Sequence, residues 1–193
     1  AFKGYESIAL FGLDNRSTGT FESGNSDAII VVSINKESGE IKMASVYRDT
    51  YLDIGEDHFR KANAAYANGG PKQAIEMLNK NLDLGITDYV SVDFSALTQA
   101  IDLLGGIELD IQEDEVGYMN DYIDTTGEIV GHSSSHVSAG TGVHVDGVQA
   151  TAYTRIRYTE GWDYRRTERQ RTVIQKMFEK AKACDLLTLN HVL

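Results

Sequence analysis

The sequence predicts an α/β fold in which helices cover both faces of a sheet. Short apolar runs at residues 7–13, 28–34 and 107–111 have the length and composition of strands. Between and after them lie stretches with apolar residues at helical spacing, bounded by glycine, proline or serine. Because strands and helices alternate along the chain, a sheet covered on both faces is the favoured arrangement.

The amino-terminal part is expected to contain three strands, over residues 7–13, 28–34 and 41–47. The first run ends at Asp14 and the second begins just after Asp27. Both runs are continuously apolar, which suits strands buried on two faces. Since Ser38-Gly39 is a turn signal, the second and third strands are predicted to form a hairpin.

Helices are predicted where a break precedes an amphipathic stretch. Asn68-Gly69-Gly70-Pro71 interrupts the chain, and Pro71 suits the first turn of the helix that follows. Gly105-Gly106 ends a second helix that begins at Ser95. The other expected elements are strands over 89–94 and 107–111, a short helical stretch from 146, an extended segment over 153–157 and a final helix over 164–183.

Residues 117–144 break this alternation. They are rich in Gly, Ser, Thr and His and show little periodicity, which indicates a long loop or insertion. His132, His136 and His144 lie in this stretch, but their spacing lacks the partner set of a tetrahedral zinc site. A flexible polar loop is therefore the preferred interpretation.

Length and composition fit one domain over residues 1–193. A chain of 193 residues with 41% hydrophobic and 24% charged residues is typical of a folded protein of that size. The net charge of -11 argues against a nucleic-acid binder, because phosphate backbones are held by an excess of Lys and Arg. Cys184 is the only cysteine, so no internal disulfide forms and the compartment stays open. No apolar run reaches the ~18 residues of a membrane helix, and the first residues suggest a trimmed or processed amino end.

Arginines gather near the carboxyl end of this acidic chain. Six of the nine lie between Arg155 and Arg171. In an extended segment, Arg155 and Arg157 would project from one side while Ile156 faces the other. On the following helix Asp163, Arg166 and Gln170 share a face that continues into apolar residues.

That helical spacing predicts that Arg166 and Gln170 point inward, whereas Arg165, Arg169 and Arg171 on other faces are expected to be solvated. An inward arginine needs an opposing charge, and the guanidinium fork suits phosphate oxygens bound in pairs. The alternative is that these arginines pair with the surplus of Asp and Glu, as most surface arginines do. The inward spacing favours an anion site.

Asp14 and Asp27 lie at neighbouring strand ends and are expected to meet at one edge of the sheet. Carboxylates beside arginines suggest Mg²⁺, which takes one or two carboxylates and completes its shell with water and phosphate. The alternative is that the two aspartates only cap a turn and a strand end. Arg48 follows the third strand and is expected to point toward the sheet edge where Asp14 and Asp27 meet. Lys61 either points to the same place or is a solvated charge, as most lysines are.

Several pieces of the chain, in this order, resemble those of the LytR-CpsA-Psr family over about residues 7–175. They are Gly12-Leu13-Asp14-Asn15-Arg16, Ser26-Asp27-Ala28, Ser45-Val46-Tyr47-Arg48-Asp49-Thr50, Lys61-Ala62-Asn63-Ala64 with Gly69-Gly70, Leu103-Leu104-Gly105-Gly106-Ile107, Gly147-Val148-Gln149-Ala150, Tyr153-x-Arg155-x-Arg157 and Asp163-x-x-Arg166-x-x-Arg169-Gln170. The chain departs from the family at Tyr47, where Pro is usual, and at Thr151, where Leu is usual.

The resemblance implies a three-layer αβα sandwich with a central mixed sheet, which holds a polyprenyl chain in an apolar tunnel. It also implies a phosphotransferase on the outer face of the cell membrane of a bacterium of Gram-positive type, with teichoic acid or capsule as the polymer that it moves. An amino-terminal membrane helix, absent from this chain, would anchor it. The partners implied are a polyprenyl-pyrophosphate-linked glycopolymer and a peptidoglycan acceptor.

By position, the resemblance implies metal ligands for Mg²⁺ at Asp14 and Asp27. It implies pyrophosphate binding by Arg16, Arg48, Lys61, Arg155, Arg157, Arg166 and Gln170. We expect Arg48, Arg155, Arg157 and Asp163 to take part in catalysis, with Asp49 or Asp163 accepting the proton of the attacking hydroxyl. Phosphoryl transfer depends on positioning and charge stabilisation, so no separate nucleophile is required. Two other functions stay open: hydrolysis of the same pyrophosphate, and a non-catalytic module that binds isoprenoid lipid or anionic glycan.

Overall fold

The structure, a computed structural model, describes residues 4–14 and 24–183 of the chain. These residues separate into two compact units, residues 1–93 and residues 94–193. Each unit has an apolar core of its own. The single domain expected from the sequence stays a prediction. None of the helices in the described ranges combines the length and the apolarity needed to cross a membrane.

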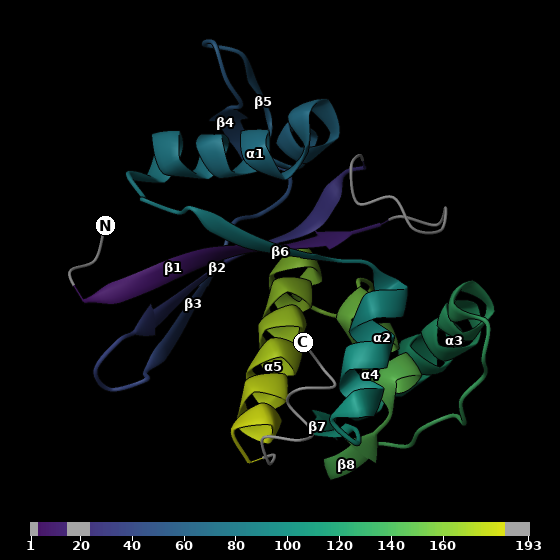
Figure 1. The fold of residues 1–193 in the computed structure, drawn as a ribbon. Helices are drawn as coiled ribbons and strands as arrows, with labels where there is room; N and C mark the ends of the chain where they lie inside the picture. Colours follow the sequence, from purple (N-terminus) through teal and green to yellow (C-terminus); the bar gives the residue numbers. More distant parts are fainter. Residues whose placement is uncertain (1–3, 15–23, 184–193) are drawn as a thin grey trace. The chain divides into compact units, whose positions relative to one another are not determined.

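Unit 1 is built on a mixed four-stranded sheet (Figure 1). Its strands, in the spatial order β3-β2-β1-β6, are β3 (Ile41–Ser45), β2 (Ser26–Asn35), β1 (Tyr5–Leu13) and β6 (Asp88–Val92). β2 is antiparallel to β1 and to β3, whereas β6 runs parallel to β1. The predicted hairpin of the second and third strands is therefore confirmed.

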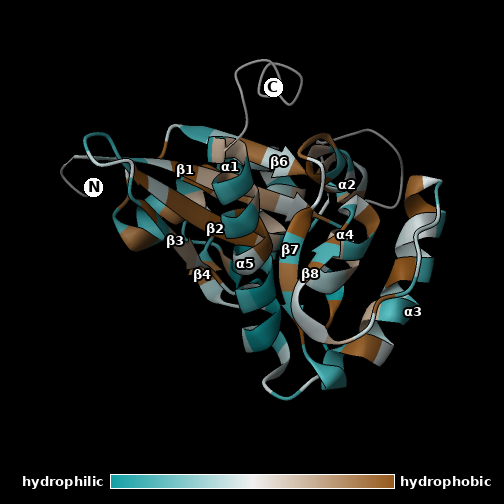
Figure 2. Cartoon of the chain, turned by 90° about the horizontal axis from the view of Figure 1, so that it is seen from below, coloured by the Kyte–Doolittle hydropathy of each residue, from teal (hydrophilic) through white to brown (hydrophobic). Residues whose placement is uncertain are grey.

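The apolar core of unit 1 lies on one face of this sheet. Alternate residues of β1, namely Ala9, Phe11 and Leu13, point into it beside Ile29 and Val31 of β2. Figure 2 shows the apolar residues gathered along these strands. In β2, residues 29–33 are all buried, as predicted, but in β1 only every second residue from 9 to 13 is fully buried. The expectation of burial on two faces was thus wrong for β1.

Helix α1 (Asn63–Leu82) packs on that core. Its Tyr66 ring meets the ring of Phe11 edge to face, with 5.3 Å between centroids. The predicted break at Asn68-Gly69-Gly70-Pro71 is present as a kink, because Gly70 has φ 65° and ψ -160°, which is incompatible with a helix. The chain is already helical before the kink, from Asn63, where the sequence predicted no helix.

A small hairpin of β4 (Tyr51–Asp53) and β5 (Phe59–Lys61) also belongs to unit 1. The Asn81 side chain of α1 clamps it, accepting from the Asp53 amide at 3.2 Å and donating to the Asp53 carbonyl at 2.8 Å. Gln73 Nε2 donates to the Ile54 carbonyl at 2.7 Å. Strands of three residues without an apolar alternation gave no signal in the sequence.

In unit 2, the described residues 94–183 form four helices and a two-stranded antiparallel ribbon. Its elements are α2 (Phe94–Leu103), β7 (Ile107–Ile111), α3 (Glu113–Val130), β8 (Gly140–Val145), α4 (Gly147–Arg155) and α5 (Trp162–Ala183). The ribbon pairs β7 with β8. The predictions of α2, β7 and α5 are confirmed to within two residues at each end.

The predicted loop over residues 117–144 is wrong. Helix α3 and strand β8 occupy most of it, which leaves residues 131–139 as the connection. The buried side of α3 repeats every four residues at Glu115, Met119, Ile123 and Gly127. Two of these four positions are not apolar, so the helical period was hidden.

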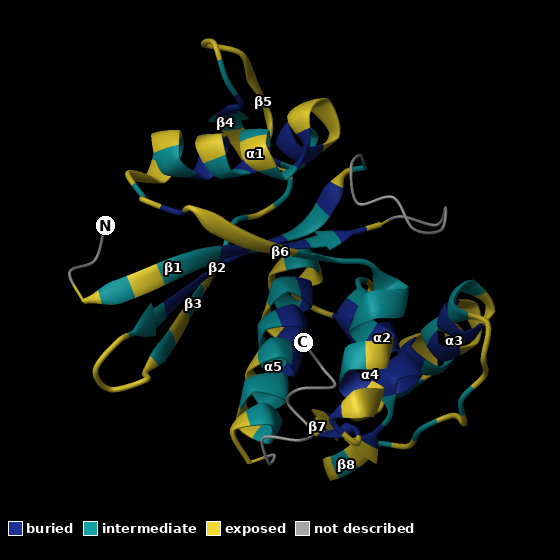
Figure 3. Cartoon of the chain, in the orientation of Figure 1, coloured by how far each residue is buried: buried dark blue, intermediate teal, exposed yellow. Residues whose placement is uncertain are grey.

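Helix α4 is the most deeply buried helix of unit 2, since residues 147–154 are all buried (Figure 3). Asp146 caps it by accepting from the Gln149 amide at 2.9 Å. The helix continues to Arg155, so the predicted extended segment over 153–157 is wrong for its first three residues. Thr151, Tyr153 and Thr154 favour strands by propensity, but burial of this segment overrides that preference.

Close approach of α2 and α4 explains two residues of α4. A Cβ added to Gly147 would lie 2.1 Å from the Thr98 carbonyl oxygen, so only glycine fits there. Thr151, where the family usually has Leu, shares a hydrogen bond of 3.0 Å with the hydroxyl of Thr98. Both side chains are buried, and each hydroxyl is a hydrogen-bond partner of the other. The departure from the family is therefore accommodated by a polar pair.

Candidate active-site residues

Four of the predicted site residues in unit 1 form one ion-pair chain. Arg48 Nη1 lies 3.0 Å from Asp27 Oδ2 and Arg48 Nε lies 3.6 Å from Asp49 Oδ2. Lys61 Nζ lies 2.6 Å from Asp49 Oδ1. The structure therefore brings Asp27, Arg48, Asp49 and Lys61 together, and we call them the ion-pair chain.

Backbone hydrogen bonds fix the turn that carries Arg48. The Thr50 amide donates to the Tyr47 carbonyl at 2.9 Å, which closes the turn. The Asn63 amide at the start of α1 donates to the Arg48 carbonyl at 3.0 Å. The turn is thus closed with Tyr47 at the position where the family usually has Pro.

The two predicted metal ligands lie at neighbouring strand ends, as expected. Asp14 is exposed and directly follows β1. Asp27 lies in β2 where the pairing with β1 shifts register, between the pairs Gly12–Ala28 and Leu13–Ser26. No group of three or more potential metal ligands occurs among His, Cys, Asp and Glu of the described ranges. Two carboxylates are nevertheless a donor set that fits Mg²⁺, which leaves several positions to water and substrate phosphate.

Arg16 was predicted to bind pyrophosphate, but it lies outside the described residues. It therefore stays a prediction.

In unit 2, Arg155 is held by two rings and two hydroxyls. Its guanidinium carbon lies 4.8 Å from the ring centroids of both Phe94 and Tyr122. Arg155 Nη1 donates to Thr126 Oγ1 at 2.8 Å and to Thr125 Oγ1 at 3.2 Å. Arg155 is thus fixed at the end of a helix rather than in the extended segment that the sequence predicted.

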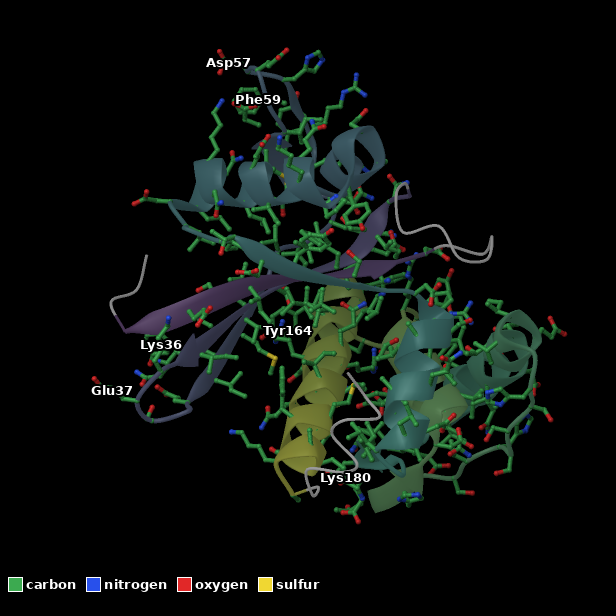
Figure 4. The ribbon with its side chains drawn as sticks, viewed as in Figure 1. Lys36, Glu37, Asp57, Phe59, Tyr164 and Lys180 are labelled. Carbon is green, nitrogen blue, oxygen red and sulfur yellow. The ribbon has the colours of Figure 1, made fainter. Side chains whose placement is uncertain are left out.

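The other predicted residues of unit 2 follow or lie in α5. Arg157 is half-buried just after α4, and Asp163 is half-buried in the first turn of α5. Arg166 and Gln170 are buried, with 7% and 8% of their surface exposed, which confirms the predicted inward orientation. Figure 4 labels Tyr164, which is exposed near the start of α5, and Lys180, which is half-buried near its end.

Arg169 was predicted to be solvated, and this prediction is wrong. Only 2% of its surface is exposed, and its Nε lies 2.8 Å from Oε1 of the equally buried Glu115. Arg169 Nη1 also donates to the Ile156 carbonyl at 3.2 Å, and Nη2 donates to Thr159 Oγ1 at 2.6 Å. Arg169 therefore holds the segment that contains Arg157.

The sequence contained a signal for Arg169. It lies three residues after Arg166 and four before Val173, which is the spacing of a single helical stripe. Glu115 was missed because its helix was not predicted, although an acidic triplet, residues 113–115, is typical of a first helical turn.

Tyr153 lies beside this buried pair. Burial raises the pKa of Tyr153 to about 12, and the nearby Glu115 carboxylate adds to the effect. The guanidinium of Arg169 lies 5.8 Å from the centroid of the same ring. The phenol therefore stays protonated at neutral pH and cannot serve as a base there.

The histidines of the predicted loop are dispersed over different elements. His136 Nε2 lies 2.9 Å from Asp124 Oδ1 of α3. His144 lies in β8, and His132 lies in the connection after α3.

Comparison with known proteins points to one family. The sequence profile of the LytR_cpsA_psr family matches residues 2–193. The chain is similar to the polyisoprenyl-teichoic acid–peptidoglycan teichoic acid transferase TagU of Enterococcus faecalis, with 35% identity over 188 residues, which is 96% of this chain and 55% of that protein. The chain spans about half the length of the curated relatives it matches.

Solved structures show the same fold. The structure of TagT bound to LI-WTA superposes with a TM-score of 0.78 and 27% identity, over 94% of this chain and 66% of that one. The family protein YwtF (TagT) with bound octaprenyl pyrophosphate lipid gives a TM-score of 0.75 and 25% identity, over 98% of this chain and 72% of that one. This agreement confirms the predicted α/β fold class with its mixed sheet.

Proposed function

Since the chain belongs to the LytR-CpsA-Psr family, we propose that it transfers an anionic glycopolymer from a polyprenyl pyrophosphate carrier to peptidoglycan. The similarity to a protein named as a teichoic acid transferase supports the reaction. The similarity to a structure that contains octaprenyl pyrophosphate supports the carrier. The proposed product is a phosphodiester between the polymer and the cell wall.

The fixed arginines are the observation that carries this proposal. Arg48 is held by Asp27, and Arg155 is held between two rings, so each guanidinium is oriented before any ligand binds. Charge stabilisation of this preorganised kind is the main requirement of phosphoryl transfer. We assign pyrophosphate binding to Arg48, Lys61, Arg155, Arg157, Arg166 and Gln170, with Arg16 as a further candidate.

In the proposed reaction, a sugar hydroxyl of peptidoglycan attacks the phosphorus next to the glycan. A new oxygen–phosphorus bond forms as the bond from that phosphorus to the bridging oxygen breaks, so polyprenyl phosphate leaves. The arginines neutralise the negative charge that builds on the phosphate oxygens. Mg²⁺ bound by Asp14 and Asp27 would add positive charge of the same kind.

The attacking hydroxyl must lose a proton, and we assign its acceptance to Asp163. The alternative, Asp49, already accepts from Lys61 at 2.6 Å and lies 3.6 Å from Arg48, so its carboxylate serves to orient these cations. A carboxylate engaged by two cations is a weaker proton acceptor. Asp163 is half-buried at the start of α5, three residues before Arg166.

The cellular setting is part of the proposal. A polyprenyl carrier and a peptidoglycan acceptor meet at the outer face of a bacterial cell membrane. We therefore propose that this chain is the extracellular catalytic part of a protein that a membrane helix anchors.

A transfer assay with arginine variants tests the proposal. Arg155→Ala and Arg157→Ala are expected to lower the rate of polymer transfer at least about 100-fold, because each removes charge stabilisation from the transition state. Arg171→Ala, on the same acidic chain but outside the assigned residues, serves as the matched control. Near-normal turnover of the first two variants would exclude their assigned role.

A further inference from the structure

Two aromatic rings stack on each other and stay exposed on the β4–β5 hairpin of unit 1. Tyr51 is 69% exposed and Phe59 is 50% exposed. Their rings are stacked, with 5.9 Å between centroids and 27° between planes. We call this pair the aromatic platform. Figure 4 shows Phe59 near the end of the hairpin, close to Asp57.

The aromatic platform shares its face of the hairpin with Lys61 of the ion-pair chain. Tyr51 is paired directly with Lys61 in the strand register, so these side chains project from the same face as Phe59. Lys61 Nζ lies 2.6 Å from Asp49 Oδ1, and the other carboxylate oxygen of Asp49 lies 3.6 Å from Arg48 Nε. An exposed pair of stacked rings thus borders the charges to which we assign pyrophosphate binding.

The hairpin that carries these rings is held in place before any ligand binds. Asn81 of α1 bonds both backbone polar groups of Asp53, and Gln73 bonds the Ile54 carbonyl. The buried Asp53 carboxylate also pairs with Lys80 of α1. Because the hairpin is already ordered, a ligand that stacks on the aromatic platform costs the hairpin little conformational entropy.

We propose that the aromatic platform is a carbohydrate subsite, on which one face of a hexose ring stacks. A sugar ring has an apolar face of C–H groups and an edge of hydroxyls, which matches stacked rings bordered by Lys61 and Asp49. Large rings that stay exposed together beside charges are typical of binding surfaces. This inference rests on the proposed function, because the sugar belongs either to the lipid-linked polymer or to the peptidoglycan acceptor.

A purely structural role predicts different behaviour. Cross-strand aromatic pairs stabilise hairpins, so loss of both rings would then lower the stability of the chain and leave its ligand affinities unchanged. Another exposed ring pair, Tyr158 and Trp162, lies in unit 2 and meets edge to face at 77°. It supplies a matched control for unspecific effects of removing exposed rings.

The test compares three variants. The double variant Tyr51→Thr with Phe59→Thr removes both rings and keeps residues that favour strands. The double variant Tyr51→Phe with Phe59→Tyr keeps both rings. The control double variant is Tyr158→Thr with Trp162→Thr. Circular dichroism and thermal unfolding establish that each variant is folded.

Binding is measured for three probes by calorimetry with the chain as it stands. The probes are a short prenyl pyrophosphate, the same pyrophosphate bearing a disaccharide, and a peptidoglycan fragment without pyrophosphate. The ring-free variant is expected to bind the disaccharide form or the peptidoglycan fragment roughly tenfold more weakly. Its affinity for the sugar-free prenyl pyrophosphate should stay unchanged, as should all affinities of the ring-retaining and control variants.

Each outcome separates the subsite from the proposed function. The probe whose binding weakens identifies the sugar as that of the donor or that of the acceptor. Equal affinities of the ring-free variant and the unmodified chain for both sugar-bearing probes would overturn the subsite while leaving the transfer reaction intact. Failure of the unmodified chain to bind either pyrophosphate probe would contradict the proposed function. The subsite would then be tested only by comparing the ring-free variant with the unmodified chain for the peptidoglycan fragment. Equal weakening for all three probes would show a structural role and also overturn it.

Discussion

Arg169 of α5 and Glu115 of α3 form an ion pair inside unit 2, with 2.8 Å between Nε and Oε1 and 2% of each residue exposed. The same guanidinium bonds the Ile156 carbonyl and the Thr159 hydroxyl, which lie on either side of Arg157. Because a buried guanidinium needs all its partners, these contacts determine where the segment after α4 lies. Arg169 therefore positions a segment that carries a proposed pyrophosphate ligand.

Removing one member of this pair should be strongly destabilising. Arg169→Met leaves the Glu115 charge buried, which costs about 3–5 kcal/mol in the free energy of unfolding measured with urea. Arg165→Met is the matched control, since Arg165 approaches the same carboxylate at 3.8 Å but its side chain is 38% exposed. That control should lose less than about 1 kcal/mol. Equal losses in the two variants would contradict the burial argument.

The buried hydroxyl pair of Thr98 and Thr151 makes a second prediction. Thr151→Val leaves the Thr98 hydroxyl without this partner and should lower the free energy of unfolding by about 1–2 kcal/mol. Adding Thr98→Val should restore part of the loss, because two apolar groups of the same shape no longer need each other. A double-mutant cycle in urea measures the coupling, and strictly additive losses would refute it.

Acid stability should depend on Asp53. The hydrogen bond from Lys80 holds the pKa of Asp53 below its ordinary value of 3.8, and the Gly55 amide adds to the effect. A carboxyl whose folded pKa is depressed stabilises the fold above its unfolded pKa and loses that contribution as the pH falls through the folded value. Asp53→Asn is therefore expected to flatten the fall in stability below about pH 4.

Unfolding by urea at a series of pH values tests this. Glu6→Gln is the matched control, since Glu6 pairs with Lys36 at 3.1 Å while both side chains stay more than half exposed. This control variant should show nearly the same fall in stability at acid pH as the unmodified chain. An Asp53→Asn variant that keeps the full acid dependence would rule out the Asp53–Lys80 pair as its source.

The manner in which Arg155 is held makes a prediction about catalysis. Arg155→Lys keeps the charge but loses the planar group that lies between Phe94 and Tyr122. Transfer activity should fall at least about tenfold, while the free energy of unfolding changes by less than about 2 kcal/mol. Initial rates and urea unfolding of the same preparation check both, and an unchanged rate would show that charge alone suffices.

Local signals predicted much of this fold. The run at 107–111 and the glycine pair before it predicted β7 and the end of α2, because short apolar runs and glycines act through the local backbone. The position of Arg48 beside Asp27 followed from where strands end. Both inferences needed no knowledge of distant contacts.

Elements that depend on distant contacts were not predicted. Helix α3 buries Glu115 and Gly127. Glu115 forms an ion pair with Arg169 of α5, and at Gly127 an added Cβ would lie 2.9 Å from the His132 carbonyl oxygen. Arg155 ends a helix because α4 is buried, although its residues favour a strand. In each case a partner far along the chain decided the local structure, and the sequence pattern did not contain that partner.

Product analysis of the unmodified chain tests the central claim most directly. The chain is incubated with a polyprenyl-pyrophosphate-linked glycopolymer, peptidoglycan and Mg²⁺, and the wall fraction and soluble fraction are analysed by mass spectrometry. We predict a polymer joined to peptidoglycan through a phosphodiester, with one polyprenyl phosphate released for each linkage. Release of glycan phosphate with no linkage to the wall would contradict the account.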